Sequence, residues 1–376
     1  MISRRFFTFA AGAAALGGFG SVQAQSSGKI ILGQSAAFTG PAAQLGIQFN
    51  QGAKVWFDQF NAQGGLGGKT IEIKKLDDGY EPDRCAANTR TLIDNGVFAL
   101  FGYIGTPTSL AAMPMVKSEQ IPFFTPFTGA MGLRDAASNK YAVHLRASYD
   151  DETALMVKHL TNLGLKRIAV FYQNDSYGKG GLTGVTQALA ALNLKPVAIA
   201  SVERNSVDVA GAVSTLMASQ PDAVVQISVY KSSAAFIRGA RASGYHGALY
   251  NTSFVGTQAL AEELGKEAAG VVISQVVPSP FDTSRAIVRE FAANVKQAGG
   301  DSRVNYSSME GYLAAKLFTE GLRRGPSATR EGLMRGVEAI GQQSMGGFNV
   351  NLSASNHVAS KFVEISMLSG DGRVVT

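Results

Sequence analysis

The chain has one cysteine, Cys85, and four histidines in 376 residues, so it can form neither an internal disulfide nor a cysteine-rich zinc site. It contains no HExxH metalloprotease motif and no GxSxG nucleophile motif. Gly68-Lys69-Thr70 resembles the end of a phosphate-binding P-loop, but Gln63 stands where the first glycine is required. We therefore expect no metal, no cofactor and no enzymatic activity.

Charged residues are also scarce, at 16%, while 45% of the residues are hydrophobic. This composition excludes a disordered chain and favours a large buried core. The formal net charge is only +6, and the one dense basic pair, Arg323-Arg324, falls at the end of an expected helix, where cations are favourable. No basic patch with interleaved aromatic residues occurs, so we expect no nucleic-acid partner.

The N-terminus is typical of an export signal. Arg4 and Arg5 precede a mild apolar run from Phe6 to Phe19, and Val22-Gln23-Ala24 matches a small-x-small cleavage site. We expect residues 1–24 to be removed and the mature chain to be periplasmic. The run is too short to span a bilayer. The two arginines fit twin-arginine export and an ordinary secretory signal equally well.

Strand and helix patterns alternate along the mature chain. Helical spacing is clear in 41–62, where Leu45, Phe49, Trp56 and Phe60 fall on one face, and Asp150 or Asp151 can cap the helix that follows. We expect strands at 29–34, 70–76, 97–102, 121–124, 167–172, 196–202, 223–228, 248–251, 271–276 and 361–368. Repeated strand–helix units predict an α/β fold with parallel sheets covered by helices on both faces. About ten strands predict two such sheets.

Ligands of parallel sheets bind where strands end and helices begin, so the strand-end loops hold the candidate site residues. Gly105 and Thr106 follow 97–102, and their helix N-terminus could bind an anion, although Thr106 could simply cap the helix. Phe127, Thr128 and Gly129 follow 121–124, with Phe127 either exposed to a ligand or buried in the core.

Three further loops follow strands in the second half. Tyr177 follows 167–172 and could cover an apolar ligand, although Asp175 could make its loop a plain helix cap. Tyr230 follows 223–228 and Ser253 follows 248–251. The acidic pair Asp77-Asp78 is interpreted as a solvated strand end, and Cys85 as buried packing. No loop contains a nucleophile with a base beside it.

These pieces, in their order and spacing, resemble the periplasmic leucine/isoleucine/valine-binding proteins of ABC importers. The resemblance covers about residues 29–376. It rests on Phe38-Thr39-Gly40-Pro41, the segment 61–69, Asp77-Asp78, the segment 121–126, Leu145-Arg146 before Asp150, and Tyr177-Gly178.

The resemblance implies a type I periplasmic binding fold, in which two α/β lobes joined by three crossovers close on a ligand. By analogy the first lobe is 28–149 plus 278–350 and the second is 150–277 plus 351–376. Thr106 corresponds to a hydroxyl that binds the ligand carboxylate, and Tyr177 and Tyr230 correspond to aromatic residues that close over the ligand.

Two positions depart from the family pattern. Gly129 stands where a second carboxylate-binding threonine is expected, with Thr128 one residue earlier. Ser253 stands where an acidic residue neutralises the ligand's ammonium, and a buried ammonium without a countercharge is costly. Either another carboxylate substitutes, with Glu310 the best choice, or the ligand has no α-ammonium. For Glu310 the alternative is an acid placed favourably near a helix N-terminus.

The sequence thus predicts a periplasmic solute-binding protein that delivers an amino acid or related small carboxylate to ABC permease subunits in the inner membrane. The alternative is a ligand-sensing module that acts on a receptor or chemoreceptor. An exported hydrolase is disfavoured because no catalytic constellation is found.

Overall fold

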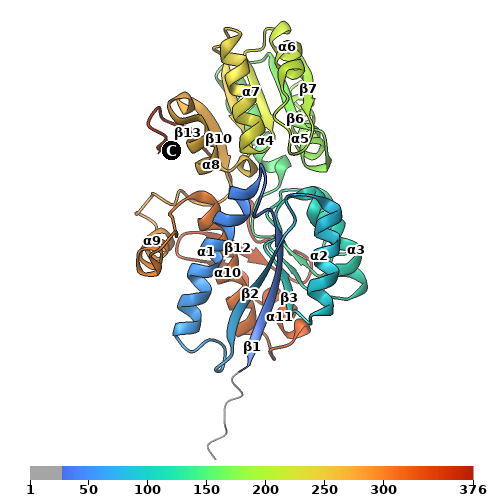
Figure 1. Cartoon of the computed structure of the whole chain (residues 1–376), viewed down its shortest axis with the longest axis vertical. Helices are drawn as coiled ribbons and strands as arrows, with labels where there is room; N and C mark the ends of the chain where they lie inside the picture. The colour runs from blue at the N-terminus through green and yellow to red at the C-terminus, as the bar shows by residue number, and fades with distance from the viewer. Residues whose placement is uncertain (1–27, 376) are drawn as a thin grey trace, which may run out of the picture.

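The computed structural model describes residues 28–375, and the export signal predicted for residues 1–24 lies outside them. Figure 1 shows two bodies stacked along the long axis, each built on its own sheet. The first sheet has five strands in the order β2-β1-β3-β4-β5, and every neighbouring pair is parallel. Its strands are β1 (Lys29–Ala36), β2 (Thr70–Asp77), β3 (Ala99–Phe101), β4 (Phe123–Phe124) and β5 (Ala142–Val143).

The second sheet has seven strands in the order β14-β13-β10-β9-β8-β6-β7. Strands β6 to β10 pair in parallel, whereas β13 runs antiparallel to β10, and β14 antiparallel to β13. Its members are β6 (Ile168–Gln173), β7 (Ile199–Val202), β8 (Ala223–Ile227), β9 (Ala248–Asn251), β10 (Val271–Gln275), β13 (Glu364–Leu368) and β14 (Val374–Val375). The parallel α/β prediction is therefore confirmed, with an antiparallel edge that periodicity did not reveal.

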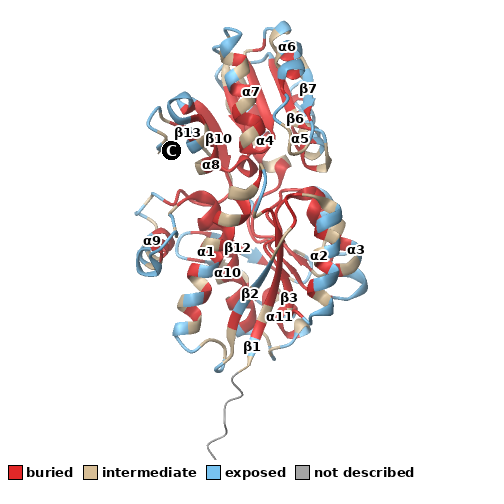
Figure 2. Cartoon of the chain, in the orientation of Figure 1, coloured by how far each residue is buried: buried red, intermediate tan, exposed pale blue. Residues whose placement is uncertain are grey.

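Helices cover both sheets, and the strands beneath them are the most buried part of each body (Figure 2). The helices are α1 (Ala43–Ala62), α2 (Pro82–Asp94), α3 (Thr106–Ser118), α4 (Tyr149–Asn162), α5 (Ser176–Ala190), α6 (Ala210–Ala218), α7 (Tyr230–Ala242), α8 (Thr257–Leu264), α9 (Ala286–Ala298), α10 (Tyr306–Arg324) and α11 (Arg330–Glu338). Helix α1 packs on α10, where the Trp56 indole donates to Thr319 across 2.9 Å. Cys85 is fully buried, as its isolation in the sequence predicted.

The chain passes between the two bodies three times. It leaves the first sheet after β5, returns after β10 to form α9, α10 and α11, and crosses again before β13. The small antiparallel pair β11 (Gly341–Ser344) and β12 (Asn349–Leu352) precedes the last crossing. The predicted boundary at 350/351 falls inside β12, and the exact division into lobes stays a prediction.

One helix start differs from its prediction. Ser148, rather than Asp150 or Asp151, caps α4, because its hydroxyl accepts from the Asp151 backbone amide at 3.0 Å while the Asp151 carboxylate accepts from the Ser148 amide. This reciprocal arrangement moves the helix start to Tyr149 and carries that side chain into the region between the sheets.

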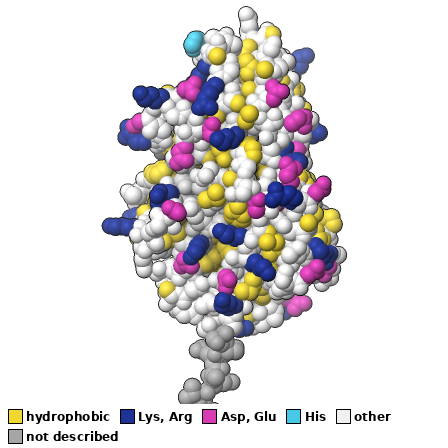
Figure 3. All heavy atoms as spheres, viewed as in Figure 1, with side chains coloured by type: hydrophobic (Ala, Val, Ile, Leu, Met, Phe, Trp, Pro, Cys, Tyr) yellow, Lys and Arg dark blue, Asp and Glu magenta, His cyan; other side chains and the backbone are white. Residues whose placement is uncertain are grey.

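No helix among residues 28–375 has the length and apolarity needed to cross a bilayer. On the face shown in Figure 3, basic and acidic side chains are interspersed. That face therefore presents no continuous field of one sign, which agrees with the modest net charge.

Candidate functional site

Two threonine hydroxyls meet at the carboxyl ends of adjacent strands. Thr106 begins α3 just after β3, Thr128 follows β4, and their Oγ1 atoms are 2.7 Å apart. Both side chains are buried. Thr106 does not cap its helix, since the N-cap is Gly105 and no side chain bonds there. The hydroxyls therefore lie beside free backbone amides of a helix N-terminus, an arrangement that suits an anion.

Two glycines allow aromatic rings to lie close to this pair. Gly105 has φ 95°, and a Cβ there would lie 2.1 Å from Cε2 of Tyr80. A Cβ on Gly129 would lie 2.6 Å from Cδ1 of Tyr149, whose amide donates to the Gly129 carbonyl at 2.9 Å. The Tyr149 hydroxyl is 3.4 Å from Thr128 Oγ1. The space that a side chain at Gly129 would need is thus occupied by the Tyr149 ring.

Five aromatic side chains form one buried group between the two sheets, which we call the aromatic cluster. Its ring centroids are 5.1 Å apart for Tyr149 and Tyr177, 4.5 Å for Tyr177 and Phe254, 5.6 Å for Phe254 and Phe127, and 6.0 Å for Phe254 and Tyr80. The Tyr177 hydroxyl shares a hydrogen bond of 2.7 Å with Thr252. The aromatic cluster supplies an apolar wall beside the two threonines.

Phe127 joins the aromatic cluster to the core of the first sheet. Its ring lies 5.6 Å from Phe49 on one side and 4.2 Å below the Arg146 guanidinium on another. Phe127 is thus buried in the core, as one of its two predicted alternatives had it, and its contact with a ligand stays a prediction. Similarly, Asp175 caps α5 by accepting from the Tyr177 and Gly178 amides, and this cap fixes the direction of Tyr177.

Arg146 is the central charged residue of the site. Its Nε lies 3.0 Å from Glu310 Oε1, and its Nη2 donates to Glu310 Oε2 at 3.1 Å and to Ser253 Oγ at 3.0 Å. Arg146 and Glu310 are both almost fully buried. Burial raises the pKa of Glu310, although Arg146 opposes that shift. Burial acts to lower the pKa of Arg146, but Glu310 and Glu152 hold it above its usual value.

A second buried carboxylate, Glu152, lies behind Ser253. Its Oε2 accepts from the Ser253 amide at 2.8 Å and from the Ser274 hydroxyl at 2.5 Å. Its Oε1 and the Nη1 of Arg146 are buried and have no hydrogen-bond partner among residues 28–375. Arg146 Nε also lacks a hydrogen bond among these residues but is ion-paired with Glu310 Oε1 at 3.0 Å. Ser253 therefore lies between a guanidinium whose Nη1 and a carboxylate whose Oε1 have neither kind of partner in this part of the chain.

Tyr230 lies apart from the aromatic cluster. It is the first residue of α7 and is buried, and its pKa is raised by burial while a hydrogen bond with the Gln44 backbone of α1 opposes that shift. It thus joins α7 to the start of α1.

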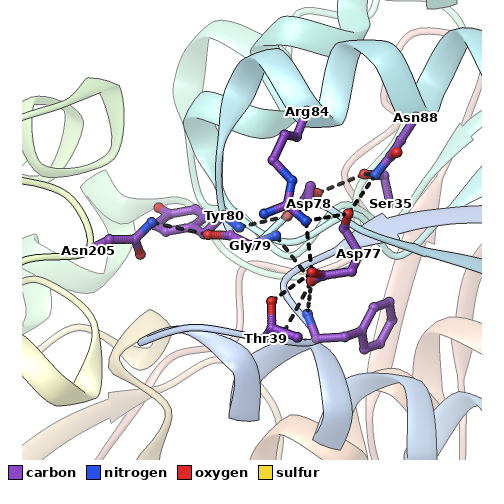
Figure 4. A network of polar contacts seen from close by, with 10 residues as sticks. Ser35, Thr39, Asp77, Asp78, Gly79, Tyr80, Arg84, Asn88 and Asn205 are labelled. Atoms are coloured by element: carbon purple, nitrogen blue, oxygen red, sulfur yellow. Dashed lines mark hydrogen bonds and ion pairs between the residues drawn. The ribbon is translucent and has the colours of Figure 1, made fainter.

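The acidic pair after β2 is not a solvated strand end, and that interpretation was wrong for Asp78. Asp78 is fully buried, where its carboxylate accepts from the Ser35 hydroxyl at 2.7 Å and from the Tyr80 amide at 2.8 Å (Figure 4). Burial, with the Asp77 charge beside it, raises the pKa of Asp78 to about 6. The buried carboxylate holds the backbone of Tyr80, which has φ 64°, so its role is to position an aromatic wall residue.

Asp77 acts as an anchor in the same network (Figure 4). Burial acts to raise its pKa, but hydrogen bonds from Thr39, Phe38 and Gly79 outweigh it and lower the pKa to about 2. Arg84 pairs with the same carboxylate at 2.9 Å. The loops after β1 and β2 are thereby tied together at the rim of the site.

Polar contacts also join the loop after β2 to the loop after β7, across the two sheets. Glu81 accepts from Arg204 at 2.8 Å and from Asn205 at 2.7 Å, and Asn205 also donates to the Gly79 carbonyl at 3.1 Å. We call these four residues the rim bridge. It lies outside the aromatic cluster and holds the two bodies in the observed arrangement.

A sequence model described as a periplasmic binding protein matches residues 29–372. The chain belongs to the periplasmic binding proteins, in the leucine/isoleucine/valine-binding group. It is 26% identical over 375 residues to the Leu/Ile/Val-binding protein homolog 7 of Brucella suis biovar 1, with 94% of this chain and 92% of the relative covered.

Two solved structures share the whole fold. One is a possible leucine/isoleucine/valine-binding protein from Rhodopirellula baltica SH 1, at 32% identity and a TM-score of 0.89, covering 94% of this chain and 98% of that one. The other is a substrate-binding periplasmic protein from Ralstonia solanacearum, at 29% identity and a TM-score of 0.86, covering 92% and 99%. The type I periplasmic binding fold inferred from the resemblance is confirmed, and the relatives are binding proteins.

In this periplasmic binding protein the structure brings together most of the residues singled out in the sequence. Gly105, Thr106, Phe127, Thr128, Gly129, Tyr177, Ser253 and Glu310 lie around one buried region, whereas Tyr230 makes no hydrogen bond, ion pair or ring contact with any of these described residues. Glu310 is not at the helix start, because α10 begins at Tyr306, and its partner is Arg146. Whether these residues contact a ligand stays a prediction.

Sequence reasoning missed Tyr80, Tyr149, Glu152 and Arg146 as site residues. Arg146 was part of the resemblance, but its side-chain direction could not be read from the chain. Tyr80 could have been chosen as a candidate from the sequence, because it follows Gly79 directly after the acidic pair Asp77-Asp78. Nothing local marks Glu152, which looks like an ordinary acid in the first turn of a helix.

Proposed function

We propose that this protein is the substrate-binding component of an ABC importer and binds an amino acid or related small carboxylate between two lobes. The lobes would be residues 28–149 plus 278–350 and 150–277 plus 351–376. The observation that carries the proposal is the buried pair Thr106–Thr128, at 2.7 Å, beside the N-terminus of α3 and the aromatic cluster.

Each part of the region has a chemical role in this proposal. The two hydroxyls and the α3 amides would hold the ligand carboxylate, because such donors compensate the loss of water around an anion. Phe127, Tyr177 and Phe254 would enclose the apolar part. Because these groups are buried, the lobes must open for a ligand to enter and close to hide it.

The partners would be ABC permease subunits in the inner membrane, which would distinguish the closed, loaded form from the open one. The names of the Brucella and Rhodopirellula relatives support a ligand of the leucine, isoleucine and valine type. Ser253 stands where the resemblance leads us to expect an acidic residue, and this is a reason to test carboxylates without an amine as well.

Binding is tested by thermal shift of residues 25–376 against amino acids and amine-free carboxylates, followed by calorimetry. Thr106→Ala should weaken binding of the best ligand by about 1–3 kcal/mol, since an anion oxygen and Thr128 would each lose a partner. Thr91→Ala is the matched control, because that hydroxyl is exposed on α2 and bonds only to the Ala87 carbonyl. If the natural protein, Thr106→Ala and Thr91→Ala all bind the ligand with equal affinity, Thr106 is not part of the site.

The transport role needs a cellular measurement. A strain that lacks the chain should lose uptake of the ligand identified by calorimetry and recover it when the gene is restored. Unchanged uptake together with a lost chemotactic or transcriptional response would instead support the sensing role.

A further inference from the structure

Two buried polar atoms on either side of Ser253 have no partner among the described residues: Arg146 Nη1 is a donor and Glu152 Oε1 is an acceptor. Each belongs to a planar group whose other atom already contacts Ser253, since Arg146 Nη2 bonds the Ser253 hydroxyl at 3.0 Å and Glu152 Oε2 bonds the Ser253 amide at 2.8 Å. Buried donors and acceptors are seldom left unpaired, so this pair points to a group that completes them.

We propose that Arg146 and Glu152 form a ligand subsite at Ser253 that selects a hydroxyl, so the preferred ligand is a 2-hydroxy carboxylate and not a 2-amino acid. This inference rests on the proposed function, because it assumes that the ligand carboxylate lies at Thr106 and Thr128. It gives ligand-binding roles to Arg146 and Glu152, to which the resemblance gave none, and it names the group at the 2-position of the ligand.

The argument compares the three common groups at the 2-position of a small acid. A hydroxyl can accept from Arg146 and donate to Glu152, which satisfies both atoms. An ammonium can only donate, and it would lie next to a buried guanidinium of the same charge. An oxo group can only accept, so Glu152 Oε1 would stay unpaired.

The carboxylates of the region do not restore the balance for an ammonium. Glu310 is engaged by two guanidinium nitrogens at 3.0 and 3.1 Å. Glu152 already accepts two hydrogen bonds through Oε2. Arg134, a further buried cation of the region, donates to the Thr128, Arg146 and Ala147 carbonyls, and its position near Arg146 adds positive charge. The setting of Ser253 is therefore unfavourable for another cation.

The test uses acids that differ only at the 2-position, measured by calorimetry on the mature protein. The sets are leucine with its 2-hydroxy and 2-oxo analogues, phenylalanine with 3-phenyllactate and phenylpyruvate, and glutamate with 2-hydroxyglutarate and 2-oxoglutarate. In the set whose side chain fits, the hydroxy acid should bind at least about tenfold more tightly than the amino acid and the oxo acid.

Glu152→Gln provides the sharper test. The Ser253 amide is only a donor, so the new amide oxygen should stay on it and the new Nε2 should take the free side. That exchange replaces an acceptor with a donor, which predicts a shift of preference from the hydroxy acid toward the oxo acid by about tenfold or more. Glu72→Gln is the control, because it makes the same carboxylate-to-amide change at an exposed residue of β2 that pairs with Lys29 at 2.8 Å, and it should keep the hydroxy-acid preference.

Ser253→Asp tests the charge argument if Glu152→Gln fails to fold. The new carboxylate beside Arg146 should favour the amino acid and reverse the order of the set. An amino acid that binds the natural protein as tightly as its hydroxy analogue overturns the subsite but leaves the proposed binding of small carboxylates intact. If none of these acids binds and a wider panel yields only ligands without a carboxylate, the proposed function and the subsite both fall.

Discussion

Arg146 and Glu310 form a buried ion pair whose members are 164 residues apart, with Nε and Oε1 separated by 3.0 Å. Arg146 follows β5 of the first sheet, and Glu310 lies on α10, which the chain builds only after completing most of the second sheet. The pair therefore fixes a late helix against the crossing point between the two bodies, at the place where Ser253 meets them.

Removing one member of this ion pair should strongly destabilise the folded protein. Glu310→Gln removes the carboxylate that pairs directly with the buried guanidinium and leaves only Glu152 as a nearby countercharge, so we expect the free energy of unfolding to fall by about 3–5 kcal/mol. The double variant Arg146→Met/Glu310→Met is the control, because replacing both charges with apolar groups of similar volume should recover much of that loss. Urea unfolding measures both, and a single variant as stable as the natural protein would contradict the prediction.

The rim bridge should favour the closed arrangement without stabilising either body alone. Glu81 is 42% exposed and Arg204 25% exposed at the side chain, so each contact is worth less than about 1 kcal/mol. Glu81→Ala should therefore lower the closed-to-open ratio by about fivefold while leaving the melting temperature nearly unchanged.

Small-angle scattering measures this shift as a larger radius of gyration, with and without the ligand found by calorimetry. Glu72→Ala is the control for Glu81→Ala, because Glu72 pairs with Lys29 at 2.8 Å between two strands of the same sheet. An equal expansion in both variants would show that the rim bridge has no special effect on closure.

The fold followed from the sequence because its strongest signals are local. The helical face of Leu45, Phe49 and Phe60 and the short apolar runs indicated that helices and strands alternate. The number of predicted strands then indicated two sheets. Strands of two residues, such as β5 and β14, have no period to detect, although β4 falls inside the strand predicted at 121–124. The antiparallel edge at β13 depends on a crossing between bodies, which no local pattern encodes.

The candidate site was only partly predictable, for a related reason. Strand-end loops locate Thr106, Thr128, Tyr177 and Ser253, because topology brings such loops together. Side-chain partners across 107 residues, as for Arg146 and Ser253, are set by packing that the sequence does not display. Asp78 was misjudged because a carboxylate beside another carboxylate usually faces water, whereas here Ser35 and the Tyr80 amide compensate its burial.

Gly105 should be required both for stability and for the shape of the site. Gly105→Ala adds a Cβ at φ 95° that would lie 2.1 Å from the Tyr80 ring. Gly96→Ala is the control, since Gly96 has φ 70° but no atom within 4 Å of such a Cβ, so it should lose only about 1–2 kcal/mol of backbone strain. Gly105→Ala should lose more than that in urea unfolding and should also weaken ligand binding in calorimetry. Equal losses, with binding unchanged, would show that the Tyr80 ring moves away at no cost.

The buried Asp78 carboxyl should make stability depend on pH. Its pKa is raised from 3.8 to about 6 in the folded protein, so the folded state holds the proton more tightly than the unfolded chain does. Its stabilising contribution is therefore complete below pH 3.8 and is lost as the pH rises through 6. The shift corresponds to about 3 kcal/mol.

Asp78→Asn should remove this dependence, since the amide can accept from Tyr80, donate to Ser35 and never ionise. Unfolding free energies measured from pH 4 to 7 should fall less steeply for the variant than for the natural protein. Asp77→Asn is the matched comparison with the opposite sign, because the pKa of Asp77 is lowered to about 2, so its contribution is present above pH 3.8 and is lost only as the pH falls through 2. The same slope for Asp78→Asn and the natural protein would mean that Asp78 keeps an ordinary pKa and that water reaches it behind Tyr80.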